Sequence, residues 1–235
     1  MANIPWFYTA LPPEGLQLTL DETNSRHAVQ VLRMEAGAPL VLTNGQGGLW
    51  QATVINAHKK HCEVTITHAE EQPRTGRRVG IAISPVKNNT RLEWFIEKAT
   101  ELGVHDVYLL QAHRTEKPHI RFDRLLSIAI SAMLQSQQPY IPNLHPAKPF
   151  QKWVPACGFT HRFVAHCLPT QKTMLAAALQ PTMQDSLVLI GPEGDFTEEE
   201  IKLALEHQYQ PVALGQTRLR TETAALAAAT LCVMG

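Results

Sequence analysis

Two short loops in the last third of the chain carry polar side chains at positions where chemistry is commonly done. The first loop, Gly191-Pro-Glu-Gly-Asp195, follows the apolar run 187–190, and the second, 215–220, follows the apolar run 211–214. Each loop passes through glycine and enters a helix-like sequence. Open α/β sheets bind ligands in the crevice at the carboxyl ends of their strands. We therefore expect the two loops to lie side by side and to form a ligand site.

The side chains on these loops combine donors with acceptors. Glu193 and Glu222 offer carboxylates that can accept a hydrogen bond or a proton, and Arg218 and Arg220 offer fixed donors that stabilise negative charge. Thr221 is the predicted N-cap of the last helix, whose start favours anionic groups. A tight β–α turn and a salt-bridged helix start are the simpler alternatives.

Several other chemistries lack their motifs. No Gly-x-x-x-x-Gly-Lys-Ser/Thr or Gly-x-Ser-x-Gly occurs, and a strand follows Asn44-Gly-Gln-Gly-Gly48, which is therefore a predicted hairpin turn. Cys157, His161, His166 and Cys167 lie close in sequence. Adjacent residues of a strand point to opposite faces, and this spacing matches no familiar tetrahedral set. We expect no metal site.

Composition indicates a folded protein without a uniform electrostatic attraction for nucleic acid. Of 235 residues, 44% are hydrophobic and 18% charged, with 21 basic and 21 acidic side chains. No apolar run approaches the roughly 18 residues of a membrane span, and the first residues lack the features of a signal peptide. The four scattered cysteines favour reduced thiols in a cytoplasmic protein.

The elements that position the loops fall into two groups. Residues 1–72 read as short strands at 16–20, 39–43, 48–55 and 62–67 with one helix at 25–34, which predicts a small β-barrel-like domain. The polar stretch 70–78 is the predicted linker.

The remainder alternates strands with helices, which predicts an α/β domain with a mostly parallel sheet. The expected strands are 79–84, 104–110, 163–167, 187–190 and 212–214, and the expected helices include 121–138 and 221–234. Capping boxes are predicted at Thr90-x-x-Glu93 and Thr197-x-x-Glu200.

Four segments together resemble one known family. They are Asn24-Ser-Arg-His-Ala-Val-Gln-Val-Leu-Arg33, the segment from Glu93 to Gly103 preceded by Lys87, Ile190-Gly-Pro-Glu-Gly194, and Leu214-Gly-x-x-Arg-Leu-Arg-Thr-Glu-Thr-Ala224. In order and spacing they resemble the RsmE-type 16S ribosomal RNA methyltransferases of the SPOUT superfamily, which make N3-methyluridine. The resemblance covers essentially the whole chain.

The resemblance implies a PUA-like RNA-binding barrel at 1–72 and a trefoil-knotted SPOUT methyltransferase domain at 73–235. It also implies a homodimer that uses S-adenosylmethionine and acts on 16S ribosomal RNA of the small subunit. The implied cofactor-binding residues are Leu168, Ile190, Gly191, Pro192, Glu193, Gly194, Leu214, Gly215, Leu219, Arg220 and Thr223.

The chain departs from the family pattern at three places. Asp195 follows Gly194 where the family usually has a second glycine, 112–116 reads Ala-His-Arg-Thr-Glu, and 134–138 reads Leu-Gln-Ser-Gln-Gln. The second segment keeps Arg114 but has His113 in place of a glutamate. The third lacks both the family's carboxylate and its arginine.

Methylation of N3 would need an unpaired or flipped uridine, a group that accepts its proton and a cation that stabilises the charge on O2 or O4. Glu222 or Glu193 is the expected acceptor, and Arg220 or Arg114 the expected cation. The expected RNA contacts, gathered from both domains onto one cleft, are Arg26, His27, Arg33, Lys59, Lys60, Lys87, Arg91, Arg114 and Lys117.

The sequence is compatible with three alternative functions. The chain could be a catalytically inactive RNA-binding or ribosome-assembly module, because the 134–138 segment has lost its charged groups. It could be a SPOUT methyltransferase that acts on another RNA position. A small-molecule hydrolase using Glu193 and Glu222 is the weakest alternative, because the sequence supplies no nucleophile.

Overall fold

The computed structural model describes residues 4–116 and 120–235, and its contacts divide the chain into two compact units. The first unit comprises Met1–Arg74 and Met133–Ile141, and the second comprises Thr75–Ala132 and Pro142–Gly235. Within the described residues, every helix is too short or too polar to cross a membrane.

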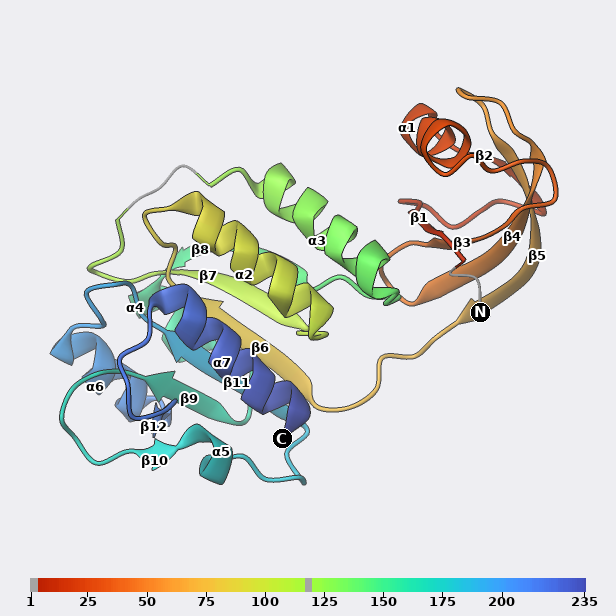
Figure 1. Ribbon diagram of the computed structural model, residues 1–235. Helices are drawn as coiled ribbons and strands as arrows, with labels where there is room; N and C mark the ends of the chain where they lie inside the picture. Colours follow the sequence, from red (N-terminus) through yellow and green to blue (C-terminus); the bar gives the residue numbers. More distant parts are fainter. Residues whose placement is uncertain (1–3, 117–119) are drawn as a thin grey trace. The chain divides into compact units, whose positions relative to one another are not determined.

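A curled five-stranded sheet forms the first unit (Figure 1), which confirms the predicted PUA-like fold. The sheet order is β1-β3-β4-β5-β2; β1 runs parallel to β3, and the other pairs are antiparallel. Apolar side chains from alternate strand positions, including Phe7, Leu40, Leu42 and Val64, make its core. The strands are β1 (Trp6–Tyr8), β2 (Gln17–Thr19), β3 (Pro39–Thr43), β4 (Gly48–Asn56) and β5 (Glu63–Glu71).

The helix of the first unit begins earlier than the predicted start at Ser25. The Asp21 carboxylate accepts a 2.8 Å hydrogen bond from the Asn24 backbone N–H, so α1 (Glu22–Arg26) starts directly after Asp21. The helix continues as a π-helical turn, His27–Val31. The predicted start rested on apolar periodicity, which the polar first turn of α1 lacks.

Residues 133–141 join the first unit through the predicted hairpin turn, which the structure confirms between β3 and β4. Gln46 forms an isolated antiparallel bridge with Tyr140, whose hydroxyl donates a 2.7 Å hydrogen bond to the Gln72 carbonyl oxygen. Gly47 has a φ of 100°, and a Cβ there would collide with the Tyr140 side chain. The turn therefore requires glycine for both its backbone and its contact.

The second unit contains a seven-stranded sheet, order β10-β12-β9-β11-β6-β7-β8, in which all neighbours are parallel. The predicted parallel α/β sheet is confirmed. The trefoil knot implied by the family resemblance stays a prediction. The strands are β6 (Arg78–Ile83), β7 (Asp106–Gln111), β8 (Asn143–Pro149), β9 (Arg162–Ala165), β10 (Thr173–Met174), β11 (Asp185–Ile190) and β12 (Gln210–Ala213).

Helices cover both faces of this sheet (Figure 1). Helices α2 and α7 contact each other, and α7 packs on β6 and β11. On the other face, Ala82, Leu187 and Leu189 belong to a buried apolar cluster with residues of α4 and α6. The helices are α2 (Asn89–Glu101), α3 (Phe122–Ser136), α4 (Phe150–Trp153) with a 3-10 turn (Val154–Ala156), α5 (Leu175–Ala178), α6 (Glu198–Glu206) and α7 (Thr221–Met234).

Two of the three predicted helix caps are wrong. Helix α2 is capped by the Asn88 side chain, which accepts from the Thr90 backbone N–H, so Thr90 lies inside the first turn. Arg220 occupies the cap position of α7, and Thr221 is the first helical residue. Only the capping box of Thr197 and Glu200 at α6 is confirmed.

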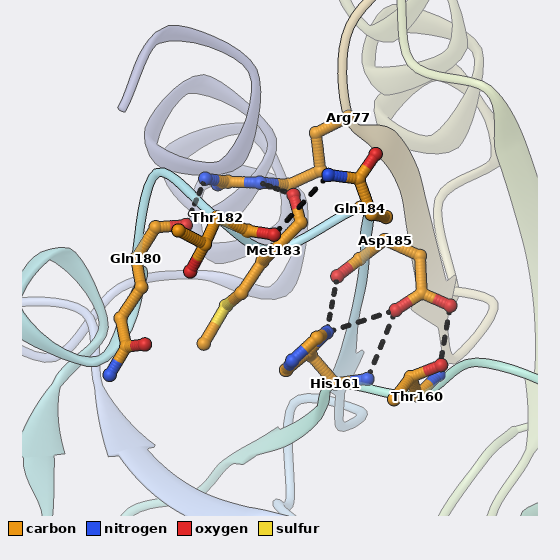
Figure 2. A network of polar contacts seen from close by, with 8 residues as sticks. All are labelled: Arg77, Thr160, His161, Gln180, Thr182, Met183, Gln184 and Asp185. Atoms are coloured by element: carbon orange, nitrogen blue, oxygen red, sulfur yellow. Dashed lines mark hydrogen bonds and ion pairs between the residues drawn. The ribbon is translucent and has the colours of Figure 1, made fainter.

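The predicted linker 70–78 is shorter in the structure, since β5 runs to Glu71 and β6 begins at Arg78. Next to β6, the Arg77 guanidinium donates to the carbonyl oxygens of Met183, Gln180 and Cys232, at 3.2, 2.7 and 3.3 Å. Figure 2 shows Arg77 above the segment that leads into β11. This arginine ties the start of the second unit to the end of α7.

Candidate functional site

A pocket of about 800 Å³ opens at the carboxyl ends of β9, β11 and β12. Strand β9 lies between β11 and β12, so the two predicted loops are separated by one strand, and the loop after β9 adds a third wall. The lining residues are Ala165, His166, Cys167, Lys172, Ile190, Gly191, Pro192, Glu193, Asp195, Val212, Ala213, Leu214, Gly215, Gln216, Thr217, Arg218, Leu219, Arg220, Thr221 and Ala224.

The loop after β11 is held from the start of α7. The Thr221 hydroxyl donates a 3.0 Å hydrogen bond to the Gly191 carbonyl oxygen. A Cβ at Gly191 would lie 3.2 Å from the Phe196 backbone nitrogen, inside ordinary contact distance, so a side chain there would push the loop apart. Both loops are therefore fixed against each other beside the pocket.

Asp195 explains why this chain tolerates the loss of the second glycine. Its φ is 65°, in the left-handed region that aspartate enters more readily than most residues. Its carboxylate accepts hydrogen bonds from the backbone N–H of Phe196 at 2.9 Å and of Cys167 at 2.7 Å. The second bond connects the loop after β11 to the loop after β9, which a glycine could not do.

The loop after β9 was largely missed as a cofactor site from the sequence, where only Leu168 was expected to bind the cofactor. Lys172 reaches back over this loop, and its ammonium donates to the carbonyl oxygens of His166 and Leu168, at 2.9 and 2.6 Å. A lysine seven residues after a strand is no recognisable signal in one sequence. Parallel pairing of β9 between β11 and β12 is what brings this loop to the pocket.

Most of the residues implied for cofactor binding line the pocket, and three do not. The lining members are Ile190, Gly191, Pro192, Glu193, Leu214, Gly215, Leu219 and Arg220. Leu168 packs against the apolar cluster, Gly194 lies in the loop beside the pocket, and Thr223 lies in α7. Their roles in binding stay predictions.

Two of the four expected catalytic residues line the pocket, and the other two do not. Glu193 and Arg220 are exposed and line the pocket. Arg114 is exposed and donates a 2.6 Å hydrogen bond to the Gly194 carbonyl oxygen. Glu222 is only 7% exposed, lies outside the pocket lining, and its carboxylate is 3.6 Å from Arg91 Nε.

Comparison with known proteins identifies the family. A family model described as an RNA methyltransferase domain matches residues 71–233, and one described as an RNA methyltransferase PUA domain matches residues 20–67. The first match covers more than half of the chain. The chain belongs to the RNA methyltransferase family.

Relatives match over nearly the full chain. A probable rRNA-methyltransferase from Porphyromonas gingivalis is 34% identical, with a TM-score of 0.88 over 98% of this chain and 99% of that one. A ribosomal RNA small subunit methyltransferase E from Neisseria gonorrhoeae, bound to S-adenosyl methionine, is 26% identical, with a TM-score of 0.85 over 97% and 96%. The enzyme of that name from Bacillus subtilis is 29% identical over 85% of this chain and 83% of its own.

The basic residues expected to contact RNA lie in both units of this family member. In the first unit, Arg26 and Lys60 approach the Glu22 carboxylate at 2.9 and 3.9 Å, so part of their charge is compensated. His27, Arg33 and Lys59 belong to the same unit.

In the second unit, Lys87 pairs with Glu116 at 3.3 Å, and Arg91 and Arg114 make the contacts described above. Lys117 lies outside the described residues. The single cleft that collects both groups stays a prediction.

Of the histidines considered for zinc, His161 is bound to a carboxylate. His161 Nδ1 lies 3.1 Å from the Asp185 carboxylate, a contact drawn in Figure 2. In the part of the chain that the structure describes, no three His, Cys, Asp or Glu side chains gather as a metal site. The four cysteines are free thiols, of which Cys62 and Cys232 are buried and Cys167 is exposed.

Proposed function

We propose that this protein transfers a methyl group from S-adenosylmethionine to N3 of a uridine in 16S ribosomal RNA. The observation that carries the proposal is the pocket at the carboxyl ends of β9, β11 and β12, lined by both motif loops. The names of the relatives from Neisseria gonorrhoeae and Bacillus subtilis support a small-subunit RNA as the substrate.

The pocket suits a ligand of this kind. Its volume of about 800 Å³ lies within the roughly 300–1,000 Å³ typical of small-molecule sites. It combines an apolar wall, including Ile190, Val212 and Leu214, with charged groups at its rim. The proposed cofactor-binding residues are Leu168, Ile190, Gly191, Pro192, Glu193, Gly194, Leu214, Gly215, Leu219, Arg220 and Thr223.

Bound S-adenosylmethionine supplies a methyl group on a positively charged sulfur. The residues of the chain would then position an unpaired uridine with N3 in line with that methyl. Arg220 lines the pocket and is the proposed cation that stabilises negative charge on O2 or O4. Arg114, whose guanidinium is bound to Gly194, would act from the outer side of the same loop.

Glu193 is our preferred acceptor for the N3 proton, with Glu222 as the second choice. Glu193 is exposed and lines the pocket, whereas Glu222 is buried beside Arg91. A proton acceptor must come within hydrogen-bond reach of the atom it serves, and only Glu193 is open to an incoming base. Glu222 would instead orient Arg91.

The substrate would be held by both units. In the proposed division, residues 1–72 would act as a PUA-like RNA-binding domain, and residues 73–235 as the methyltransferase domain. The proposed contacts to RNA are Arg26, His27, Arg33, Lys59, Lys60, Lys87, Arg91, Arg114 and Lys117. Because net charge is zero, affinity would depend on these local groups and fall steeply with salt. We further propose a homodimer that works in the cytoplasm on the small ribosomal subunit.

The decisive experiment has two stages. Calorimetric titration of the full chain with S-adenosylmethionine should show saturable binding near one per chain, and Gly191→Val should abolish it while Gly158→Ala, remote from the pocket, should not.

Incubation with small subunits and with naked 16S RNA, both prepared without the modification, should then yield N3-methyluridine by mass analysis of nucleosides. Cofactor binding without methylation of either substrate would favour the inactive module, and another methylated nucleoside would identify a different target.

A further inference from the structure

His166 is a polar side chain in the wall of the pocket without a polar partner of its own. It follows β9 directly, lines the pocket, and is 8% exposed. In the described structure, neither Nδ1 nor Nε2 of its ring has a hydrogen-bond partner, and both atoms are buried. Buried side-chain nitrogens almost always have a partner, because a buried nitrogen without one has lost its hydrogen bonds to water.

The neighbours that could satisfy the ring are already engaged. The Lys172 ammonium is turned to the carbonyl oxygens of His166 and Leu168, and the Asp195 carboxylate accepts from two backbone N–H groups. Because neither group bonds to the imidazole and His166 lines the pocket, a ligand bound in the pocket is placed to be the partner of the ring.

The ring of His166 can exchange the positions of its nitrogens and carbons by rotating in place beside the pocket. A half-turn about the Cβ–Cγ bond exchanges each ring nitrogen with a carbon at nearly the same position. His166 as a whole residue is 8% exposed, and the buried ring nitrogens contribute essentially none of that exposed surface. The half-turn moves a nitrogen to an edge now occupied by carbon.

The surroundings keep this imidazole uncharged near neutral pH. Burial lowers the pKa of His166 most, the Lys172 ammonium lowers it further, and the Asp195 carboxylate opposes both with a smaller effect. Other charged groups lining the pocket are Glu193, Arg218 and Arg220, and Cys167 is the other ionisable group. A neutral imidazole offers one donor and one acceptor, whereas a protonated one offers only donors and a positive charge.

We propose that His166 is a positioning residue that hydrogen bonds to the cofactor as an uncharged imidazole, and that its protonation selectively weakens binding of the sulfonium form. This inference rests on the proposed assignment of the pocket to S-adenosylmethionine. The sulfonium of S-adenosylmethionine is cationic and the thioether of S-adenosylhomocysteine is neutral, so a charged His166 repels the first ligand only.

The test compares the two ligands by calorimetry on the full chain from pH 7.5 down to a pH at which the ring proton resonances show His166 protonated. In the wild-type protein, the affinity for S-adenosylmethionine should fall by at least about threefold relative to S-adenosylhomocysteine over that range. His166→Gln keeps a donor and an acceptor but cannot titrate, so its affinity ratio should stay constant. His207→Gln, a histidine at the end of α6 outside the pocket, is the matched control and should behave as wild type.

Removing the imidazole should also weaken binding at pH 7.5. His166→Leu should weaken both ligands by about two- to tenfold, the usual consequence of losing one hydrogen bond. His166→Gln should recover part of that loss.

Failure of the proposed function and failure of the inference about His166 give different results. If wild-type protein binds neither ligand at any pH, the proposed function falls and this inference falls with it. If wild-type protein binds both ligands with an affinity ratio independent of pH, only the inference about His166 is overturned.

If the His166 variants do not fold, the inference can be tested on the wild-type protein. The ring proton resonances of His166 report its pKa directly, and binding of a cation beside a neutral imidazole must lower that pKa by linkage. A larger decrease with S-adenosylmethionine than with S-adenosylhomocysteine is expected; equal values would refute the proposal.

Discussion

The hydroxyl of Thr221 donates to the carbonyl oxygen of Gly191 across 3.0 Å, joining two loops that are 30 residues apart in sequence. Thr221 is the first residue of α7, and Gly191 directly follows β11. One side chain thus sets the separation between two of the three loops that surround the pocket.

Replacing Thr221 by valine should loosen the pocket. The variant keeps the shape of threonine but leaves the Gly191 carbonyl without its donor, which costs about 1 kcal/mol and should lower cofactor affinity about fivefold. Thr221→Ser, which retains the hydroxyl, should bind as wild type. Calorimetric titration with S-adenosylmethionine measures the effect, and equal affinities of the two variants would remove this bond from the account of the site.

Arg220 should matter for turnover more than for folding. Its side chain is exposed at the rim of the pocket, so Arg220→Ala should lower kcat/KM for methyl transfer by at least about 100-fold, as removal of a charge-stabilising donor does. The thermal unfolding midpoint should stay unchanged. Lys202→Ala, at an exposed lysine of α6, is the control. Near-normal kcat/KM in Arg220→Ala would show that Arg220 does not stabilise the charge on O2 or O4.

Cys167 should be the thiol that reports occupancy of the pocket. It is exposed and lines the pocket, whereas burial raises the pKa of the Cys62 thiol and raises that of Cys232 to about 11. A maleimide should therefore modify Cys167 first, because the thiolate is the reactive form. Mass spectrometry should show slower modification in the presence of S-adenosylmethionine. Modification at an undiminished rate, with the ligand at saturating concentration, would contradict the assigned site.

Asp106 should stabilise the amino-terminal edge of the parallel sheet. Its buried carboxylate accepts from Arg78, His145 and Asn143 at 2.9, 3.0 and 3.2 Å. Burial alone would raise the pKa of Asp106, but the three hydrogen bonds together outweigh it and hold that pKa below 3.8. Asp106→Asn should lower the free energy of unfolding by about 2 kcal/mol at pH 7.

The acid dependence gives a sharper check on Asp106. Because its pKa is lower in the folded state, the contribution is complete above pH 3.8 and is lost as pH falls through the folded value. Urea unfolding of wild type and Asp106→Asn should therefore converge toward pH 3. Glu206→Gln, in an exposed pair with Lys202, should change little at either pH. A constant difference between wild type and Asp106→Asn would show that shape, not charge, explains the loss.

The sequence was sufficient to predict the strands that contain apolar runs. Strands β6, β7, β11 and β12 each have a neighbouring strand on both sides, and β6, β7 and β11 are rich in β-branched residues or leucine. Strand β8 escaped prediction because it contains two prolines and is mostly exposed at the sheet edge.

The pocket was predicted only in part, for a reason of topology. The loops after β11 and β12 carry obvious motifs, but no pattern in one sequence says that β9 lies between them. The orphan ring of His166 and the reach of Lys172 depend on that order. The cap at Asn88 was missed because Thr90 is also a favoured capping residue, and the cap position of Arg220 was missed because its side chain makes no capping hydrogen bond.

Residues 133–141 make the first unit discontinuous in sequence. The chain enters the first unit, leaves it after Arg74, returns at Met133 and leaves again after Ile141. A fragment ending at residue 74 would keep the Gly45–Gly48 turn but lose Tyr140, which closes it. Neither unit can therefore be cut out as one continuous piece. Exchange of the first unit between relatives would have to carry two segments of the chain at once.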